Sequence, residues 1–116
     1  MIESYRELHV WQRSVELSVA LYRLTANFPR EEIYGLTNQL RRASVSIASN
    51  IAEGYGRGSR GEYKQFLAMA RGSNFEVQTQ LVIVRELQYT GVESIDKVEG
   101  LSIEVGKMLT VILKKL

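Results

Sequence analysis

The chain has 116 residues, 45% of them hydrophobic and 24% charged, which suits one globular domain, so we treat residues 1–116 as a single domain. It contains no cysteine, which excludes disulfides and cysteine-ligated metals and makes a cytoplasmic protein the plain interpretation. The N-terminal residues lack the apolar segment of a signal peptide, and no apolar stretch is long enough to span a bilayer, so we expect no membrane partner.

The first half of the sequence contains two stretches with the apolar period of a helix. Between residues 8 and 28, the face expected in the core carries Trp11, Val15, Leu21 and Tyr22. Phe28 and Pro29 end this helix. A second helical face covers residues 36–51 and consists of Leu36, Leu40, Ala43, Ile47 and Ile51. Residues 44–49, SVSIAS, also alternate and would suit a short strand, but the helical period covers the longer stretch and favours a helix.

The second half predicts two further helices. Residues 62–89 form one helix of about 40 Å, at roughly 1.5 Å per residue. Its core face consists of Tyr63, Phe66, Ala70, Val77, Leu81 and Val84. After a turn at residues 90–94, Ser94 is expected to cap the last helix, and Lys114 and Lys115 suit the dipole at its C-terminal end. Four amphipathic helices with short connections predict an all-α, antiparallel, up-down-up-down four-helix bundle.

Residues 56–61, GRGSRG, match the dinucleotide-binding pattern G-x-G-x-x-G. That pattern binds a nucleotide only between a strand and a helix of a βαβ unit, whereas here a helix precedes it. We therefore expect no nucleotide cofactor, and assign Gly54, Gly56, Gly58 and Gly61 to a reversal of the chain between two helices.

The residues needed for a catalytic or metal centre are scarce. His9 is the only histidine, so the Glu-x-x-His pairs of a di-iron bundle and a Ser-His-Asp arrangement are both improbable. We expect no metal, no cofactor and no catalytic residue. Asn50 and Glu53, and likewise Ser73 and Asn74, lie beside the expected core faces. They either satisfy one another structurally or form a polar pocket at the end of the bundle.

The positive charge is concentrated in the middle of the chain. Although the net charge is only +2, residues 41–71 carry six basic residues against Glu53 and Glu62. We interpret these six as candidate phosphate contacts for RNA or DNA: Arg41, Arg42, Arg57, Arg60, Lys64 and Arg71. Tyr55 and Tyr63 would stack on bases. The alternative for Arg41 and Arg42 is a solvated helix face paired with acids.

More apolar residues are present than one small bundle should expose. A second stripe on the third helix, expected at an oligomer interface, consists of Ala68, Phe75, Thr79, Val82 and Ile83. Further apolar residues outside the expected core faces are Val10, Leu17, Leu24, Ile103 and Val111. We predict a homo-oligomer; the alternative is scattered surface hydrophobic residues.

Residues 36–81, LTNQLRRASVSIASNIAEGYGRGSRGEYKQFLAMARGSNFEVQTQL, resemble the bacterial four-helix-bundle proteins related to those encoded in intervening sequences of 23S ribosomal RNA genes, often labelled S23 ribosomal proteins. Residues 7–17 and 28–43 match as well. The positions that match the family pattern are Arg41, Arg42, Asn50, Glu53, Gly54, Gly56, Ser73 and Glu76. Ala48 departs from the family, which commonly has proline there.

The resemblance implies a homopentamer without established enzymatic activity. It also implies similarity to the accessory variability determinant of diversity-generating retroelements, a basic pentamer that binds nucleic acid and a reverse transcriptase. The sequence therefore favours a non-enzymatic, oligomeric nucleic-acid-binding protein with weak sequence specificity. Two alternatives stay open: a scaffold that docks a protein such as a reverse transcriptase, and an enzyme that uses Asn50, Glu53 and Glu76.

Overall fold

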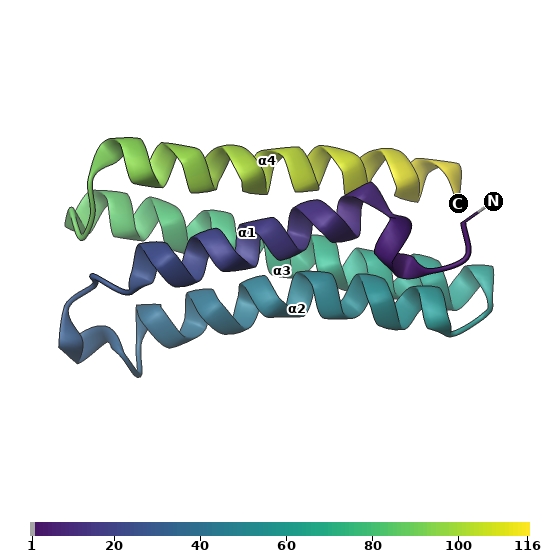
Figure 1. Cartoon of the computed structure of the whole chain (residues 1–116), viewed down its shortest axis with the longest axis horizontal. Coiled ribbons are helices and arrows are strands. Elements are labelled where there is room, and N and C mark those ends of the chain that lie inside the picture. Colours follow the sequence, from purple (N-terminus) through teal and green to yellow (C-terminus); the bar gives the residue numbers. More distant parts are fainter. Residues whose placement is uncertain (1) are drawn as a thin grey trace.

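A computed structural model describes residues 2–116 and contains four α-helices in antiparallel order (Figure 1). The helices are α1 (His9–Thr25), α2 (Leu36–Gly56), α3 (Arg60–Leu87) and α4 (Val92–Lys115). Two short 3-10 helices, η1 (Tyr5–Glu7) and η2 (Arg30–Glu32), precede α1 and α2. The molecule measures 43 × 24 × 20 Å. The predicted all-α four-helix arrangement is confirmed, and residues 44–49 are helical rather than a strand.

The two ends of the bundle differ in what they contain. We call the end that holds the α2–α3 turn, η1 and the C-terminus of α4 the bend end, on the right in Figure 1. The opposite end holds the α1–α2 connection and the short α3–α4 turn. Because the helices alternate in direction, residues far apart in sequence meet at each end.

The turns explain where the helices stop. Gly58 adopts a φ of +80° in the α2–α3 turn, a conformation that L side chains rarely adopt. The next residue, Ser59, caps α3, because its side chain accepts a hydrogen bond from the Glu62 amide. Gln88 ends α3 in a left-handed conformation, at a φ of 56°. The expectation that Ser94 caps α4 is wrong, because α4 begins at Val92 and its N-cap is Gly91, three residues before Ser94.

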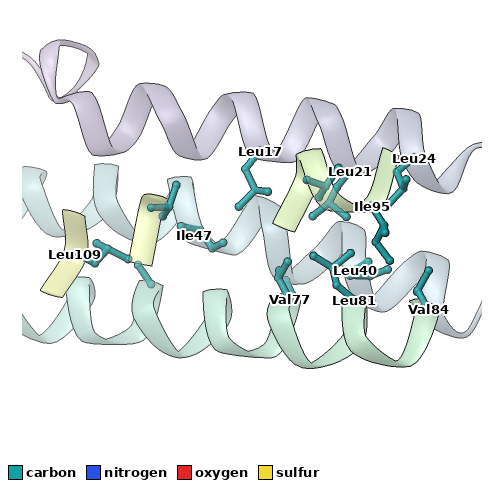
Figure 2. Packing of buried hydrophobic residues seen from close by; sticks show 14 of the residues in the cluster. Leu17, Leu21, Leu24, Leu40, Ile47, Val77, Leu81, Val84, Ile95 and Leu109 are labelled. Carbon is teal, nitrogen blue, oxygen red and sulfur yellow. The ribbon is translucent and has the colours of Figure 1, made fainter. Parts of the chain in front are cut away.

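The core runs the length of the bundle and draws on all four helices (Figure 2). The faces predicted for α2 and α3 are largely confirmed: Leu40, Ala43, Ile47 and Ile51 of α2 are buried, as are Ala70, Val77, Leu81 and Val84 of α3. The outer members of these faces, Leu36, Tyr63 and Phe66, are only partly buried.

The core face predicted for α1 is correct only in part: Leu21 is buried and Trp11 packs against the core, but the centre of the buried face lies elsewhere. Val10, Leu17 and Leu24, expected outside the core, are at most 7% exposed, whereas Tyr22 is 44% exposed. The true face also includes Ser14 and Thr25, whose hydroxyls donate to backbone carbonyls one turn earlier, at 2.7 and 2.8 Å. Burial of these two hydroxyls is tolerated because both are hydrogen-bonded, and their polar character concealed the face in the sequence.

Candidate nucleic-acid interface

The six cations expected to contact phosphates do not form one patch. Arg42 lies in α2 and Arg57 directly follows that helix, fifteen residues further on, which corresponds to about 22 Å along a helix. Arg57, Arg60 and Lys64 lie together at the bend end, whereas Arg41, Arg42 and Arg71 lie along the length of the bundle.

Arg41 has a structural role. Its Nε donates to the Thr25 hydroxyl at 2.8 Å and its Nη2 to the Tyr22 carbonyl at 3.3 Å. The guanidinium also lies over the Tyr22 ring, 4.6 Å from the centroid. Arg41 therefore ties α2 to the end of α1.

The cations of the bend end differ in their ion pairs and hydrogen bonds. Arg57 pairs with Glu53 at 2.9 Å and with Glu62 at 3.6 Å, so two carboxylates offset its charge. Arg60 donates to the Lys115 carbonyl at 2.9 Å, which satisfies a free acceptor at the end of α4. Lys64 is exposed and, within residues 2–116, takes part in no ion pair or hydrogen bond.

The antiparallel fold adds two cations to this end. Lys114 and Lys115, at the C-terminus of α4, are exposed and share the bend end with Arg60. Sequence reasoning assigned them only to the helix dipole. An up-down-up-down topology would have placed them here, because the end of a fourth helix meets the turn between the second and the third.

An aromatic hollow of about 370 Å³ lies among these cations and is lined by Gly54, Tyr55, Gly58, Ser59, Arg60, Tyr63 and Leu116. The Tyr55 and Tyr63 rings meet edge to face with centroids 6.3 Å apart. The Tyr55 hydroxyl donates to the Ile2 carbonyl at 3.1 Å. Burial raises the pKa of Tyr63, with a smaller contribution from Tyr55, so the Tyr63 hydroxyl is neutral at physiological pH.

A second hollow, the α2–α3 groove, contains several of the polar family positions. It has a volume of about 350 Å³ and is lined by Asn38, Gln39, Arg42, Ala43, Ser46, Ser73 and Glu76. Arg42 and Glu76 line it from opposite helices without forming an ion pair among the described residues. Asn50 donates to the Ser46 carbonyl and hydroxyl at 2.8 and 2.9 Å, and the Ser46 and Ser73 hydroxyls are 3.1 Å apart.

The remaining polar and glycine positions have local partners. Asn74 is fully buried and pairs with Ser102 of α4: its amide donates to the Ser102 carbonyl at 2.9 Å and accepts from the Ser102 hydroxyl at 2.7 Å. Gly54 does not belong to the bend, because it lies inside α2 and packs against Phe66. Gly56 is the last residue of α2.

The stripe expected at an oligomer interface is exposed. Ala68 and Thr79 are exposed, and Phe75, Val82 and Ile83 are 50%, 52% and 43% exposed. Ile103 and Val111 of α4 are also exposed. Phe75 lines a groove of about 380 Å³ with Ile103 and Val111, so α3 and α4 present a joint apolar surface.

Among residues 2–116, no group of three or more His, Asp or Glu side chains could hold a metal ion. None of the helices in that range is both long and apolar enough to cross a membrane. The class of protein that emerges is a small four-helix bundle with cations at one end and an apolar surface on α3 and α4.

The chain belongs to the 23S rRNA-intervening sequence protein family, whose model matches residues 6–111. The resemblance seen in the sequence is thereby confirmed. The fold is similar to the crystal structure of a protein of unknown function from the S23 ribosomal protein family of Bacteroides thetaiotaomicron, with a TM-score of 0.81 and 25% sequence identity over 90% of this chain and 98% of that chain. No functionally curated protein matches the chain.

Proposed function

We propose that this protein is a non-enzymatic, oligomeric, cytoplasmic protein that binds RNA or DNA through phosphate contacts with weak sequence specificity. The observation that carries the proposal is the convergence of cations from three parts of the chain at the bend end. Arg60 and Lys64 come from the start of α3, Arg57 from the turn, and Lys114 and Lys115 from the end of α4. Phosphate contacts of this kind supply affinity without sequence information.

Four of these five cations form no ion pair among the described residues. Glu53 and Glu62 are engaged by Arg57, whereas Arg60, Lys64 and the two α4 lysines have no carboxylate within 4.0 Å among the described residues. The hydrogen bond from Arg60 to the Lys115 carbonyl ties the start of α3 to the end of α4, so a phosphate backbone would meet cations from both helices.

The aromatic hollow favours an unpaired strand over a duplex. Tyr63 and Tyr55 offer ring surfaces beside the cations, and base stacking on aromatic side chains tolerates any sequence. Bases in a duplex are stacked on their neighbours and would not reach this hollow.

Oligomerisation would strengthen the same surface. The exposed stripe on α3 suits contact between copies, and the family resemblance favours a pentamer. A ring of copies would repeat the bend-end cations around an axis and increase the number of phosphates that one particle neutralises.

The test is a binding titration with a single-stranded oligonucleotide at several salt concentrations, followed by fluorescence anisotropy. In a variant with Lys64→Ala, Lys114→Ala and Lys115→Ala, we expect affinity to fall about tenfold or more. The slope of log K against log salt should lose roughly 0.7 for each contact removed. Arg30→Ala, an exposed cation at the opposite end, is the control and should leave both values unchanged. An affinity independent of salt would contradict the proposal.

A protein-docking scaffold is the alternative function, and the joint apolar surface of α3 and α4 favours it. Phe75, Ile103 and Val111 surround the groove there and are 50%, 44% and 51% exposed. A partner such as a reverse transcriptase would bury these side chains. Affinity capture from the native host separates the two functions: protein partners that survive nuclease treatment support the scaffold.

A further inference from the structure

A third hollow lies at the end of the bundle opposite the bend, between the last turns of α1 and the first turns of α4. It has a volume of about 230 Å³, and its polar lining consists of Arg23, Asn27, Thr90, Ser94 and Lys97. The buried side chains of Leu24 and Val98 also contribute to its walls. This volume is several times the roughly 30 Å³ that one water molecule occupies in the liquid, so a small anion fits.

The two cations of this hollow are not neutralised. Arg23 comes from α1 and Lys97 from α4, and neither takes part in an ion pair or hydrogen bond within residues 2–116. Of the acids near Lys97 on α4, Asp96 and Glu99 are engaged by Arg85 of α3, at 2.7 and 3.4 Å. Glu93, one helical turn before Lys97, forms no ion pair with it in the described part of the chain. No carboxylate lines the hollow. Two positive charges therefore face the same space without a counter-ion.

The neutral residues of the lining complete a set of hydrogen-bond donors. Asn27 offers amide hydrogens, and Thr90 and Ser94 offer hydroxyls on either side of the first residue of α4. Asn27 follows α1, Thr90 lies in the turn before α4, and Ser94 lies in the first turn of α4. Together with the two cations they offer more donors than the two oxygens of a carboxylate could accept from. A phosphate group has enough oxygens to accept from the amide, the hydroxyls, the guanidinium and the ammonium together.

We propose that this hollow binds a phosphate monoester or inorganic phosphate, recognised by Arg23 and Lys97 as a dianion. The site is separate from the bend end and does not depend on nucleic-acid binding there. Its volume leaves space beside the phosphate for a small attached group, so phosphorylated small molecules are the expected class of ligand.

The proposal is tested by titrating inorganic phosphate into ¹⁵N-labelled protein at neutral pH, with ionic strength held constant by chloride. We expect saturable amide shifts confined to residues 23–27 and 90–98. Arg23→Gln and Lys97→Gln should each weaken binding about tenfold, because each removes a charge-assisted hydrogen bond. Arg30→Gln, an exposed cation at the same end that does not line the hollow, is the matched control and should bind normally.

The site would be overturned by shifts that do not saturate, by unchanged affinity in the Arg23→Gln and Lys97→Gln variants, or by equal binding of acetate. An oligonucleotide without a terminal phosphate presents only diesters and should not compete for the hollow. Competition by that oligonucleotide would reassign the hollow to nucleic acid and contradict this proposal. Failure here leaves the salt-dependent titration of the bend end unaffected, so the two proposals fail separately.

Discussion

At the scale of single residues, Gly54 shows how closely α2 and α3 pack near the bend. A Cβ at this position would lie 2.6 Å from the Phe66 Cβ and 3.4 Å from the Tyr63 ring. No such contact occurs at Gly72, in the interior of α3, where a Cβ would meet nothing within 4 Å. The same residue type therefore has opposite consequences at the two positions.

We predict that Gly54→Ala lowers the free energy of unfolding by about 1–3 kcal/mol, because the added methyl group overpacks the helix contact. Gly72→Ala should instead raise it by roughly 0.5–1 kcal/mol, since alanine favours an exposed helix interior. Chemical denaturation measures both changes. A Gly54→Ala variant as stable as the parent would show that α2 and α3 can separate without cost.

At the level of single residues, the sequence predicted only some of the cations of the candidate nucleic-acid interface. The sequence located Arg57, Arg60 and Lys64, which lie within eight positions of one another and so remain close in any helical hairpin. The sequence did not show that Arg41 hydrogen-bonds to Thr25 and Tyr22, because these residues are sixteen and nineteen positions away from Arg41. The contribution of Lys114 and Lys115 depends in the same way on a long-range contact.

At the scale of elements, buried polar contacts fix how the helices are placed against one another. Asn74 of α3 and Ser102 of α4 form one such contact, with both side chains fully buried. A shift of either helix along the other would leave these groups without partners, at a cost of about 1–3 kcal/mol each.

We predict that Asn74→Ala lowers the free energy of unfolding by about 1–3 kcal/mol, because the Ser102 hydroxyl loses its acceptor. The double variant with Ser102→Ala should be less destabilised than the sum of the single changes, by at least about 0.5 kcal/mol. Denaturation of the four proteins of this cycle provides the measurement. Strict additivity would mean that the pair does not couple the helices.

A second inter-element contact joins the α1–α2 connection to the turn after α3. The Glu32 carboxylate accepts from the Tyr89 hydroxyl at 2.7 Å and from the Leu36 amide at 3.1 Å. These hydrogen bonds, the one from Tyr89 first, lower the pKa of Glu32 below its ordinary value. The bond to Glu32 is also the main reason that the pKa of Tyr89 is raised.

The direction of both shifts gives a pH dependence. The lowered pKa of Glu32 stabilises the fold at neutral pH, and this stabilisation disappears as the pH falls through the folded-state pKa, which lies below the ordinary value of a glutamate. The contribution of Tyr89 is complete below about pH 10 and disappears as the pH rises through its raised pKa. We expect Glu32→Gln to destabilise the protein at pH 7 and to match the parent at acidic pH. Urea denaturation at both pH values tests this, with Glu31→Gln as the control.

At the scale of the whole molecule, the exposed apolar side chains predict assembly. Phe75 and Val82 lie two helical turns apart on α3 and are 50% and 52% exposed. Ile103 and Val111 extend the apolar surface onto α4. A contiguous surface of this kind on a small protein marks an interface more often than a solvated face.

We predict that the protein is a homo-oligomer at micromolar concentration and that Phe75→Glu with Val82→Glu dissociates it. The physical reason is that two charges would be buried without partners in the interface. Light scattering coupled to gel filtration gives the mass of both proteins. Tyr34→Ser, which changes a 91% exposed side chain in the α1–α2 connection, should leave the assembly intact. A monomeric parent protein would contradict the prediction.

The sequence by itself determined the number of helices, their approximate bounds and the core faces of α2 and α3, because apolar period and turn residues are local properties. The tertiary structure decided which face of α1 is buried, where Lys114 and Lys115 lie, and which cations are already engaged. It also decided that Arg23 and Lys97, seventy-four positions apart, share one hollow. Side-chain partners across helices depend on the rotation and register of each helix, which follow from packing and not from the period of one segment.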